Sequence, residues 1–333
     1  MPPTPTALPA RARLAVPRAA MRRRIVGPDL PLADPAPAGR TLTLADGRVL
    51  GWDDTGDAAG TPVVWLHGFG STRLIRHPDD AIAARLGVRL IAPDRPGVGL
   101  SSPQPGRRVV DHADEIVRIA DTIGVGRFGI LAWSGGGPYA LACAHRHPDR
   151  VAHVGLVSAA APLAGPQAGA YVTPFHRLAG GASAVAPWAV RAAMLRWARA
   201  QRRDPAAHLD AAIDGMVPAD RDILAEPRFR AVMLRNAAEL YRQGIRGLAD
   251  EALLITRDWG FPLERIDVPV RIWHGELDPA VPAAMGRHLA ARIPGAEATF
   301  LPEEGHQLFL ARWEELLGAV AERTRGALGG RAG

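Results

Sequence analysis

The sequence contains no lysine, and all 40 of its basic residues are arginine. Alanine, arginine, glycine and proline dominate the composition, as a GC-rich coding genome produces, so the arginine bias needs no functional explanation. Cys143 is the single cysteine, which excludes an intramolecular disulfide and any metal site built from several cysteines. Because Cys143 lies in an alanine-rich helical stretch, we expect a small core residue rather than a reactive thiol.

Long apolar runs are also lacking. No stretch of about 18 apolar residues occurs, so we expect no membrane-spanning helix. The nearly apolar segment from Val154 to Ala164 is short and predicts a buried strand and its exit. Hydrophobic residues nevertheless make up 47% of the 333 residues, which is enough for a substantial core in one large domain or a domain with an insertion.

Excess positive charge is scarce beyond residue 38. The formal net charge is +6, and residues 1–38 supply +4 of it. A nucleic-acid-binding protein concentrates basic charge on its folded part, so we expect no nucleic-acid partner. Residues 1–38 also hold nine of the 30 prolines, and we predict a disordered tail there. Translation that begins at Met21 instead of Met1 would remove most of this tail. Arg22 to Arg24 lack the apolar stretch that follows in an export signal, so we predict a cytoplasmic protein.

From Thr41 onward, short β-rich runs alternate with helical stretches. Two runs, 41–44 and 49–52, flank Asp46-Gly47, a dipeptide typical of a β-hairpin. Mainly apolar strands between helices indicate an α/β fold with a mostly parallel sheet covered on both faces. The further predicted strands are Val63–Leu66, Val88–Ala92, Phe128–Ala132, Val151–Val157, Val270–Trp273 and Ala298–Leu301, and the predicted helices include 78–86, 111–123, 136–147, 282–292 and 309–325.

One region, from about Pro162 to Pro262, has helical periodicity and almost no strand signal. Its clearest helices are Trp188–Arg203 and Arg228–Gln243, each preceded by a proline, which a helix start tolerates. The region is too long for one crossover connection, so we predict a helical cap inserted after the sixth strand that controls access to the pocket. The predicted domains are a tail (1–38), a core (39–162 and 263–333) and the cap (163–262).

The segment from Gly129 to Pro138 reads Gly-Ile-Leu-Ala-Trp-Ser-Gly-Gly-Gly-Pro. A strand that runs into a serine and then into a helix is the context of a nucleophile elbow, whose sharp turn presents Ser134 above the sheet. Ala132 and Gly136, two residues before and after the serine, are small enough for the turn, although the usual pattern has glycine at the first position. A phosphate-binding loop needs another glycine spacing and a following lysine. We therefore predict that Ser134 is a nucleophile.

A second glycine-rich loop follows the buried strand that begins at Val63 and reads His67-Gly-Phe-Gly. A tetrahedral intermediate requires two preorganised N–H donors at its oxygen. We assign these to the backbone N–H groups of Phe69 and Gly135, because one donor directly follows the nucleophile and the other comes from the earlier loop. We expect His67 to fasten this loop by hydrogen bonds rather than to catalyse.

These segments resemble the cap-bearing serine hydrolase branch of the α/β-hydrolase superfamily. The run from Ala92 to Ser101, Ala-Pro-Asp-Arg-Pro-Gly-Val-Gly-Leu-Ser, is similar to the family's Asp-Arg-x-Gly-x-Gly-x-Ser turn, in which Asp94 is chiefly structural. The resemblance covers roughly residues 40–162 and 263–325. It implies the α/β-hydrolase fold, with a mostly parallel eight-stranded sheet flanked by helices, while the cap region matches only in position and in being helical.

The family's chain order, serine then acid then histidine, implies the remaining catalytic residues. A strand runs into Gly275-Glu-Leu-Asp-Pro, and the resemblance places the acid at Asp278, with Glu276 as a local rival. After the last strand, Gly305-His306-Gln307 occupies the position of the family's histidine. We therefore predict a Ser134–His306–Asp278 triad that needs no metal and no organic cofactor.

This triad predicts a carboxylic ester hydrolase that acts on small to medium apolar acyl groups through an acyl-enzyme. A serine at the nucleophile position argues against dehalogenases and epoxide hydrolases, and the His-Gly-Phe-Gly loop argues against an aminopeptidase. A C–C bond hydrolase or cofactor-free perhydrolase with the same triad, and a non-catalytic receptor on this fold, stay open. The expected partner is a small-molecule substrate. Apolar residues that either line its pocket or form the core of the cap are Tyr171, Phe175, Trp188, Met194, Trp197 and Met216.

Overall fold

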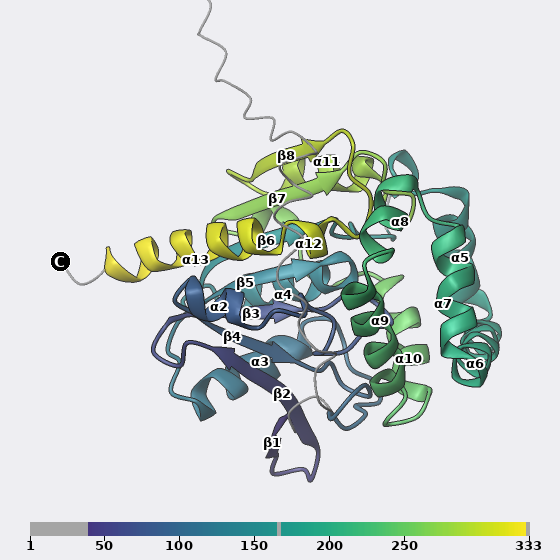
Figure 1. Ribbon diagram of the computed structural model, residues 1–333, viewed down its shortest axis with the longest axis horizontal. Coiled ribbons are helices and arrows are strands. Elements are labelled where there is room, and N and C mark those ends of the chain that lie inside the picture. The colour runs from purple at the N-terminus through teal and green to yellow at the C-terminus, as the bar shows by residue number, and fades with distance from the viewer. Residues whose placement is uncertain (1–38, 165–167, 331–333) are drawn as a thin grey trace, which may run out of the picture. The chain divides into compact units, whose positions relative to one another are not determined.

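A computed structural model describes residues 39–164 and 168–330, and the predicted tail lies outside them. The described residues form an eight-stranded sheet in the order β1-β2-β4-β3-β5-β6-β7-β8 (Figure 1). Strand β2 runs antiparallel to β1 and to β4, and the other pairs are parallel. The strands are β1 (Arg40–Thr43), β2 (Val49–Gly56), β3 (Thr61–Leu66), β4 (Val88–Pro93), β5 (Phe128–Trp133), β6 (Val151–Val157), β7 (Val270–Gly275) and β8 (Glu297–Leu301).

The predicted hairpin and the six further predicted strands are confirmed. The hairpin turns at Gly47, whose φ of +82° is the left-handed conformation that glycine adopts without steric cost. The central strands β5 and β6 are buried along their whole length, which explains why their sequences are apolar runs rather than alternating patterns.

Helices cover both faces of the sheet. Helix α13 packs on β3, β5 and β6, and in Figure 1 it crosses in front of the sheet. Helix α2 contacts α13 and packs on β2 and β4. Helices α3 and α4 pack against each other, and α4 also contacts β5 and β6. The helices outside the β6–β7 connection are α2 (Ala81–Arg85), α3 (Asp111–Thr122), α4 (Gly137–Arg146), α11 (Ala283–Arg292), α12 (Leu308–Ala311) and α13 (Trp313–Gly329).

The prediction of one helix over 309–325 is wrong, because the segment is divided into α12 and α13 at Arg312. Arg312 leaves the helical conformation, with φ −108° and ψ 17°, and its guanidinium pairs with Glu304 and Glu315. Phe309 and Trp313, four residues apart, both contact the Trp65 ring. The apolar spacing thus continues across the break, which is why periodicity alone does not reveal it.

The chain between β6 and β7 is helical, as predicted. We call Pro174–Ile255 the helical insertion; it occupies the right of Figure 1, with α8 and α9 nearest the sheet. Helices α5 to α9 each begin with proline. Proline has no backbone N–H, but no hydrogen bond is lost, because an N–H in the first turn has no acceptor within the helix. Its helices are α5 (Pro174–Val185), α6 (Pro187–Arg203), α7 (Pro205–Asp214), α8 (Pro218–Leu224), α9 (Pro227–Leu240) and α10 (Arg246–Ile255).

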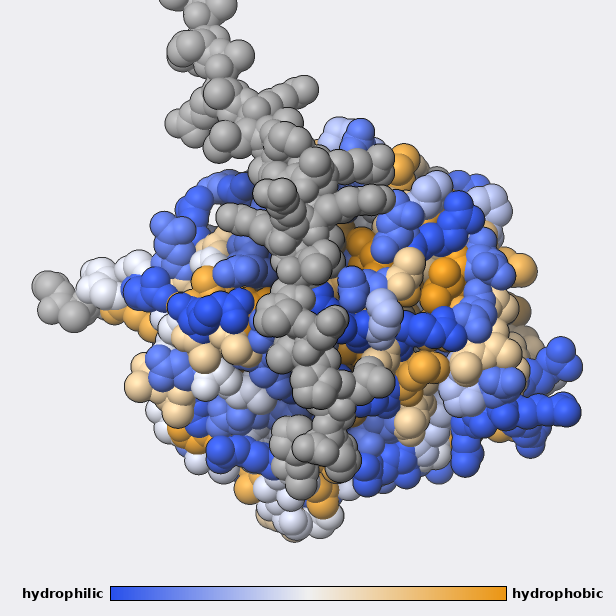
Figure 2. All heavy atoms as spheres, viewed as in Figure 1, coloured by the Kyte–Doolittle hydropathy of each residue, from blue (hydrophilic) through white to orange (hydrophobic). Residues whose placement is uncertain are grey.

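The surface of the helical insertion is partly apolar. Figure 2 shows orange, apolar residues among blue, charged ones on the side where these helices lie. Phe175, Leu178, Val185 and Trp188 are each at least 72% exposed, so Phe175 and Trp188 are surface residues. None of the helices that the structure describes combines the length and the apolar character needed to cross a bilayer.

Candidate active site

Ser134 lies at the turn between β5 and α4. Its φ is +53°, a left-handed conformation that costs a non-glycine residue about 1–2 kcal/mol. The turn is crowded, because a Cβ added at Gly136 would lie 2.2 Å from the carbonyl oxygen of Leu66. The strained backbone and the obligatory small residue are the geometry expected of a nucleophile elbow.

The loop after β3, His67–Gly70, packs directly against this turn. A Cβ added at Gly135 would lie 2.8 Å from the backbone nitrogen of Phe69, and one added at Gly68 would lie 3.3 Å from Ser134 Cβ. The structure therefore brings together Ser134 and the two residues whose N–H groups we predicted as oxyanion donors. We call residues 67–70 the oxyanion loop.

His67 itself is buried, and among the described residues its Nδ1 has one hydrogen-bond contact, the neighbouring carbonyl oxygen of Gly68 at 3.0 Å. Burial and the nearby Arg95 hold the pKa of His67 well below its usual value, so the ring is neutral. The loop is fastened instead by Arg95, which donates to the carbonyl oxygens of His67 and Gly68. Arg95 was part of the Asp-Arg turn recognised in the sequence, but nothing in that motif pointed to this contact.

Asp278 and His306 are in direct contact. His306 Nδ1 lies 2.7 Å from Asp278 Oδ2, and the other oxygen, Oδ1, accepts the backbone N–H groups of Ala280 (2.9 Å) and Val281 (2.8 Å). Burial would raise the pKa of Asp278, but His306 and the Val281 amide lower it overall. Asp278 therefore stays ionised at neutral pH and stabilises a charged imidazole. The rival Glu276 pairs with Arg287.

Trp133 links His306 to the serine. Its indole Nε1 donates to the carbonyl oxygen of His306 (2.9 Å), and the two rings are 5.0 Å apart between centroids. Because Trp133 directly precedes Ser134, this contact holds the histidine loop against the elbow. Asp278 and Asp220 raise the pKa of His306, although burial alone would lower it.

Two acidic residues of the helical insertion reach this site, and neither was predicted from the sequence. Asp220 in α8 accepts the backbone N–H groups of His306 (2.9 Å) and Gln307 (2.8 Å). Glu251 in α10 lies 2.7 Å from Arg95 Nε; the two form an ion pair, although they are not aligned for a hydrogen bond. These contacts join segments far apart in the chain, so no local motif could have revealed them.

Apolar residues of the helical insertion also cover the oxyanion loop. A Cβ added at Gly70 would lie 3.4 Å from Trp197 Cη2 and 3.9 Å from Leu248 Cδ1. Trp197 and Phe69 pack against the same buried cluster, which includes Leu248. Trp197, one of the aromatic residues suggested for a pocket, thus contacts the oxyanion loop, whereas the Tyr171 ring lies tilted against the His288 ring with the centroids 4.2 Å apart.

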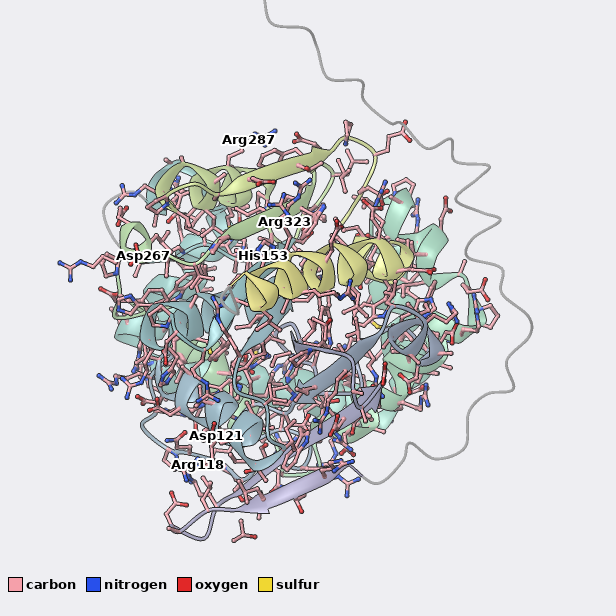
Figure 3. The ribbon with its side chains drawn as sticks, turned by 90° about the vertical axis from the view of Figure 1, so that its left-hand side faces the viewer. Arg118, Asp121, His153, Asp267, Arg287 and Arg323 are labelled. Atoms are coloured by element: carbon pink, nitrogen blue, oxygen red, sulfur yellow. The ribbon has the colours of Figure 1, made fainter. Side chains whose placement is uncertain are left out.

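Other reactive side chains lie away from this site. His153 in β6 and Arg323 in α13 lie close together on the side of the sheet along which α13 runs (Figure 3). Burial and Arg323 lower the pKa of His153 to about 4, so it is neutral. Cys143 is fully buried, which raises the pKa of its thiol to about 12. No group of His, Cys, Asp and Glu within residues 39–164 and 168–330 has the arrangement of a metal site.

Comparison with protein families matches residues 61–312 to the alpha/beta hydrolase fold family. Among curated proteins, an acetyltransferase component of the acetoin cleaving system from Pseudomonas putida is 36% identical over 118 residues. That match spans 34% of this chain and only 31% of the relative's length. A pimeloyl-[acyl-carrier protein] methyl ester esterase from Neisseria meningitidis is 28% identical over 271 residues, 80% of this chain and 77% of the relative.

Solved structures share the architecture. The esterase EaEST from Exiguobacterium antarcticum superposes with a TM-score of 0.64 at 20% identity, covering 86% of this chain and 99% of that chain. At this level of identity the similarity establishes the fold alone.

Proposed function

Because the chain belongs to the alpha/beta hydrolase fold family, we propose that it is a serine esterase that cleaves carboxylic esters of small to medium apolar acyl groups. Ser134 is the nucleophile, His306 the general base and Asp278 the acid that orients it. The backbone N–H groups of Phe69 and Gly135 form the oxyanion hole. The helical insertion acts as the cap that limits access to Ser134, as part of the cap proposed over 163–262.

The observation that carries this proposal is the 2.7 Å contact between His306 Nδ1 and Asp278 Oδ2. An ionised carboxylate at Nδ1 keeps the ring proton on that nitrogen and leaves Nε2 free to accept a proton. Nε2 then takes the proton of Ser134 Oγ as this oxygen attacks the ester carbonyl. Asp278 stabilises the imidazolium that results.

The negative charge of the tetrahedral intermediate falls on the former carbonyl oxygen. The close packing of Gly135 on the Phe69 amide supports a site in which both N–H groups converge on that oxygen. His306 then protonates the leaving alcohol, and the acyl group stays on Ser134. A water molecule, deprotonated by the same Nε2, hydrolyses the acyl-enzyme and restores the serine.

An ester is the substrate class that this site fits best. An alkoxide leaving group needs only modest protonation, which a plain triad supplies, whereas an amide leaves as a more basic amine. A curated relative that matches 80% of this chain is named for a methyl ester. Ser134 is only 9% exposed, and Trp197 covers the adjacent loop, so an apolar acyl group of limited size is favoured over a long chain.

Covalent labelling tests the nucleophile. A fluorophosphonate probe is expected to modify Ser134 alone, and mass spectrometry of the digested protein identifies the labelled serine. Ser134→Ala is expected to abolish labelling and to lower the hydrolysis of p-nitrophenyl esters by several orders of magnitude, on the order of a millionfold if it follows a serine-protease precedent. Esters of graded acyl length measure the size preference, with short and medium chains turned over fastest.

Ser158→Ala provides a matched control. Ser158 is also a buried serine with a left-handed backbone (φ +45°), but its hydroxyl has no hydrogen-bond partner within the described residues. The control is expected to keep both labelling and turnover. A folded wild-type protein that binds a small ligand but neither reacts with the probe nor cleaves any ester would refute the esterase and favour a receptor.

A further inference from the structure

The carboxylate of Asp220 lies against the backbone that carries His306. Its two oxygens accept one N–H each, Oδ2 from His306 and Oδ1 from Gln307, at 2.9 and 2.8 Å. Both amides lie in the turn just before α12 (Leu308–Ala311), outside the helix and the strands. Asp220, which is 86 residues earlier in the chain, supplies their acceptors.

The fit around this carboxylate is close. Asp220 is only 1% exposed, and a Cβ added at Gly305 would lie 2.5 Å from its Cγ and from both oxygens. The glycine before His306 therefore lets the carboxylate reach the two amides. Because both oxygens are used, the contact fixes the orientation of two successive peptide planes, and so the direction in which the His306 side chain leaves the backbone.

Burial and Asp278 raise the pKa of Asp220, whereas the two backbone amides and the His306 ring favour its ionised form, whose charge also acts on the imidazole. Asp278 and Asp220 are the acidic groups that face His306, and both raise its pKa. His274 of β7 lies 3.9 Å from Asp278 Oδ2, and His176 of α5 also faces Asp278. Burial lowers the pKa of both of these histidines, so neither adds positive charge at neutral pH. Within the described residues, Asp220 forms no ion pair with an arginine that would cancel its effect.

We propose that Asp220 is a positioning residue of the reaction, through which the helical insertion holds the His306 backbone in place and stabilises the imidazolium. The inference rests on the proposed role of His306 as the general base. It assigns the helical insertion a part in the chemistry in addition to covering the site. A carboxylate that fixes the base from outside the core makes turnover depend on how the insertion is seated.

Asp220→Asn separates this role from a general contribution to stability. The amide keeps one acceptor, loses the charge and turns an NH2 group toward the second backbone N–H. We expect kcat for a p-nitrophenyl ester to fall roughly ten- to a hundredfold, because a misplaced catalytic group costs that much, while KM changes little. We also expect the acidic limb of the pH–rate profile to move to lower pH, because His306 loses one of two stabilising charges.

Gly305→Ala perturbs the geometry without removing charge. The φ of Gly305 lies outside the left-handed region, so alanine fits the backbone, but its Cβ would displace the Asp220 carboxylate. We expect this variant to lower kcat while shifting the acidic limb less than Asp220→Asn does. It also keeps the test decisive should Asp220→Asn fail to fold.

Glu239→Gln is the matched control, because Glu239 also joins the helical insertion to the core. Its carboxylate lies 2.6 Å from Arg73, and it has no contact with the His306 loop among the described residues. This variant is expected to lower the melting temperature but to leave kcat and the acidic limb unchanged. Histidine NMR measures the titration of the His306 imidazole independently of turnover. Spectra of the wild type and Asp220→Asn are compared, and the His306 signal is assigned as the one missing in His306→Gln.

The outcomes distinguish this inference from the proposed function. If the fluorophosphonate probe does not label wild-type Ser134, the esterase itself is refuted. The positioning role of Asp220 is overturned by a different result. In that case the probe labels the wild type and Asp220→Asn equally fast, and Asp220→Asn matches the Glu239→Gln control in kcat, in the acidic limb and in the His306 titration. A lower kcat together with a lower His306 titration in Asp220→Asn, but not in Glu239→Gln, supports it.

Discussion

The ion pair between Arg95 and Glu251 allows a quantitative prediction for Glu251→Gln. Both side chains are 1% exposed, and the substitution takes away the acidic partner of Arg95. Removing one partner of a buried pair leaves an uncompensated charge and costs about 3–5 kcal/mol. That is a large part of the roughly 5–15 kcal/mol by which a native protein is stable. The melting temperature is expected to fall by about 6–20 °C, since each kcal/mol corresponds to about 2–4 °C in domains of 150–250 residues.

The effect on turnover should be smaller than the effect on stability. In Glu251→Gln, Arg95 still donates to the carbonyl oxygens of His67 and Gly68, so the oxyanion loop keeps its main support. At a temperature where the variant stays folded, kcat should fall by less than the roughly 10²- to 10³-fold that follows the loss of an oxyanion-hole donor.

Glu315→Gln is the matched control for this experiment. Its carboxylate pairs with Arg312 at 2.9 Å, but its side chain is 54% exposed, and exposed pairs contribute about 0–1 kcal/mol. Urea unfolding followed by tryptophan fluorescence compares the two variants. If Glu251→Gln is no more destabilising than Glu315→Gln, the buried pair contributes far less than its geometry implies and the reasoning is wrong.

Two further predictions concern the acid and the base. Asp278→Asn should lower kcat by about 10⁴-fold, because an amide at Nδ1 favours the wrong histidine tautomer, whereas Glu276→Gln should be mild since that carboxylate pairs with Arg287. Steady-state kinetics of the folded variants would contradict this assignment by giving the reverse ranking. Activity should be lost as the pH falls through the pKa of His306, with a midpoint above 6.5, because Asp278 and Asp220 favour the protonated ring, which is not a base. A midpoint well below 6.5 in a pH–rate profile would show that burial outweighs the two carboxylates.

The part of the fold that local sequence determines could be predicted. Strand β5 is an unbroken apolar run that is followed by Ser134 and three glycines. Adjacent residues therefore suffice to predict both the burial of the strand and the turn after it. The hairpin at Gly47 is similar, because its turn residues stand between the strands they join. The candidate site residues lie near strand ends: Ser134 directly follows β5, while Phe69, Asp278 and His306 lie in the loops after β3, β7 and β8. For Asp278 and His306, the family resemblance supplied the role.

The rest depends on contacts between distant segments. Asp220 and Glu251 lie in helices whose sequences show only helical periodicity, and their acidic side chains look like those of any solvated helix face. Both are 1% exposed in the structure, because each meets a group of the core that no local pattern identifies. Trp188 illustrates the opposite error, since a large apolar side chain that suggested a pocket is 73% exposed.

The acidic contacts of the helical insertion have a consequence for protein engineering. Exchanging this segment for that of a relative is an obvious route to a new substrate preference. The exchange would remove Asp220, Glu239 and Glu251 together. The backbone amides of His306 and Gln307 would lose their acceptors. The buried Arg73 would lose one of its acidic partners, and the buried Arg95 would lose Glu251. A chimera that keeps both the stability and the turnover of this protein must therefore carry these three carboxylates into the grafted segment, at positions that meet the same core groups.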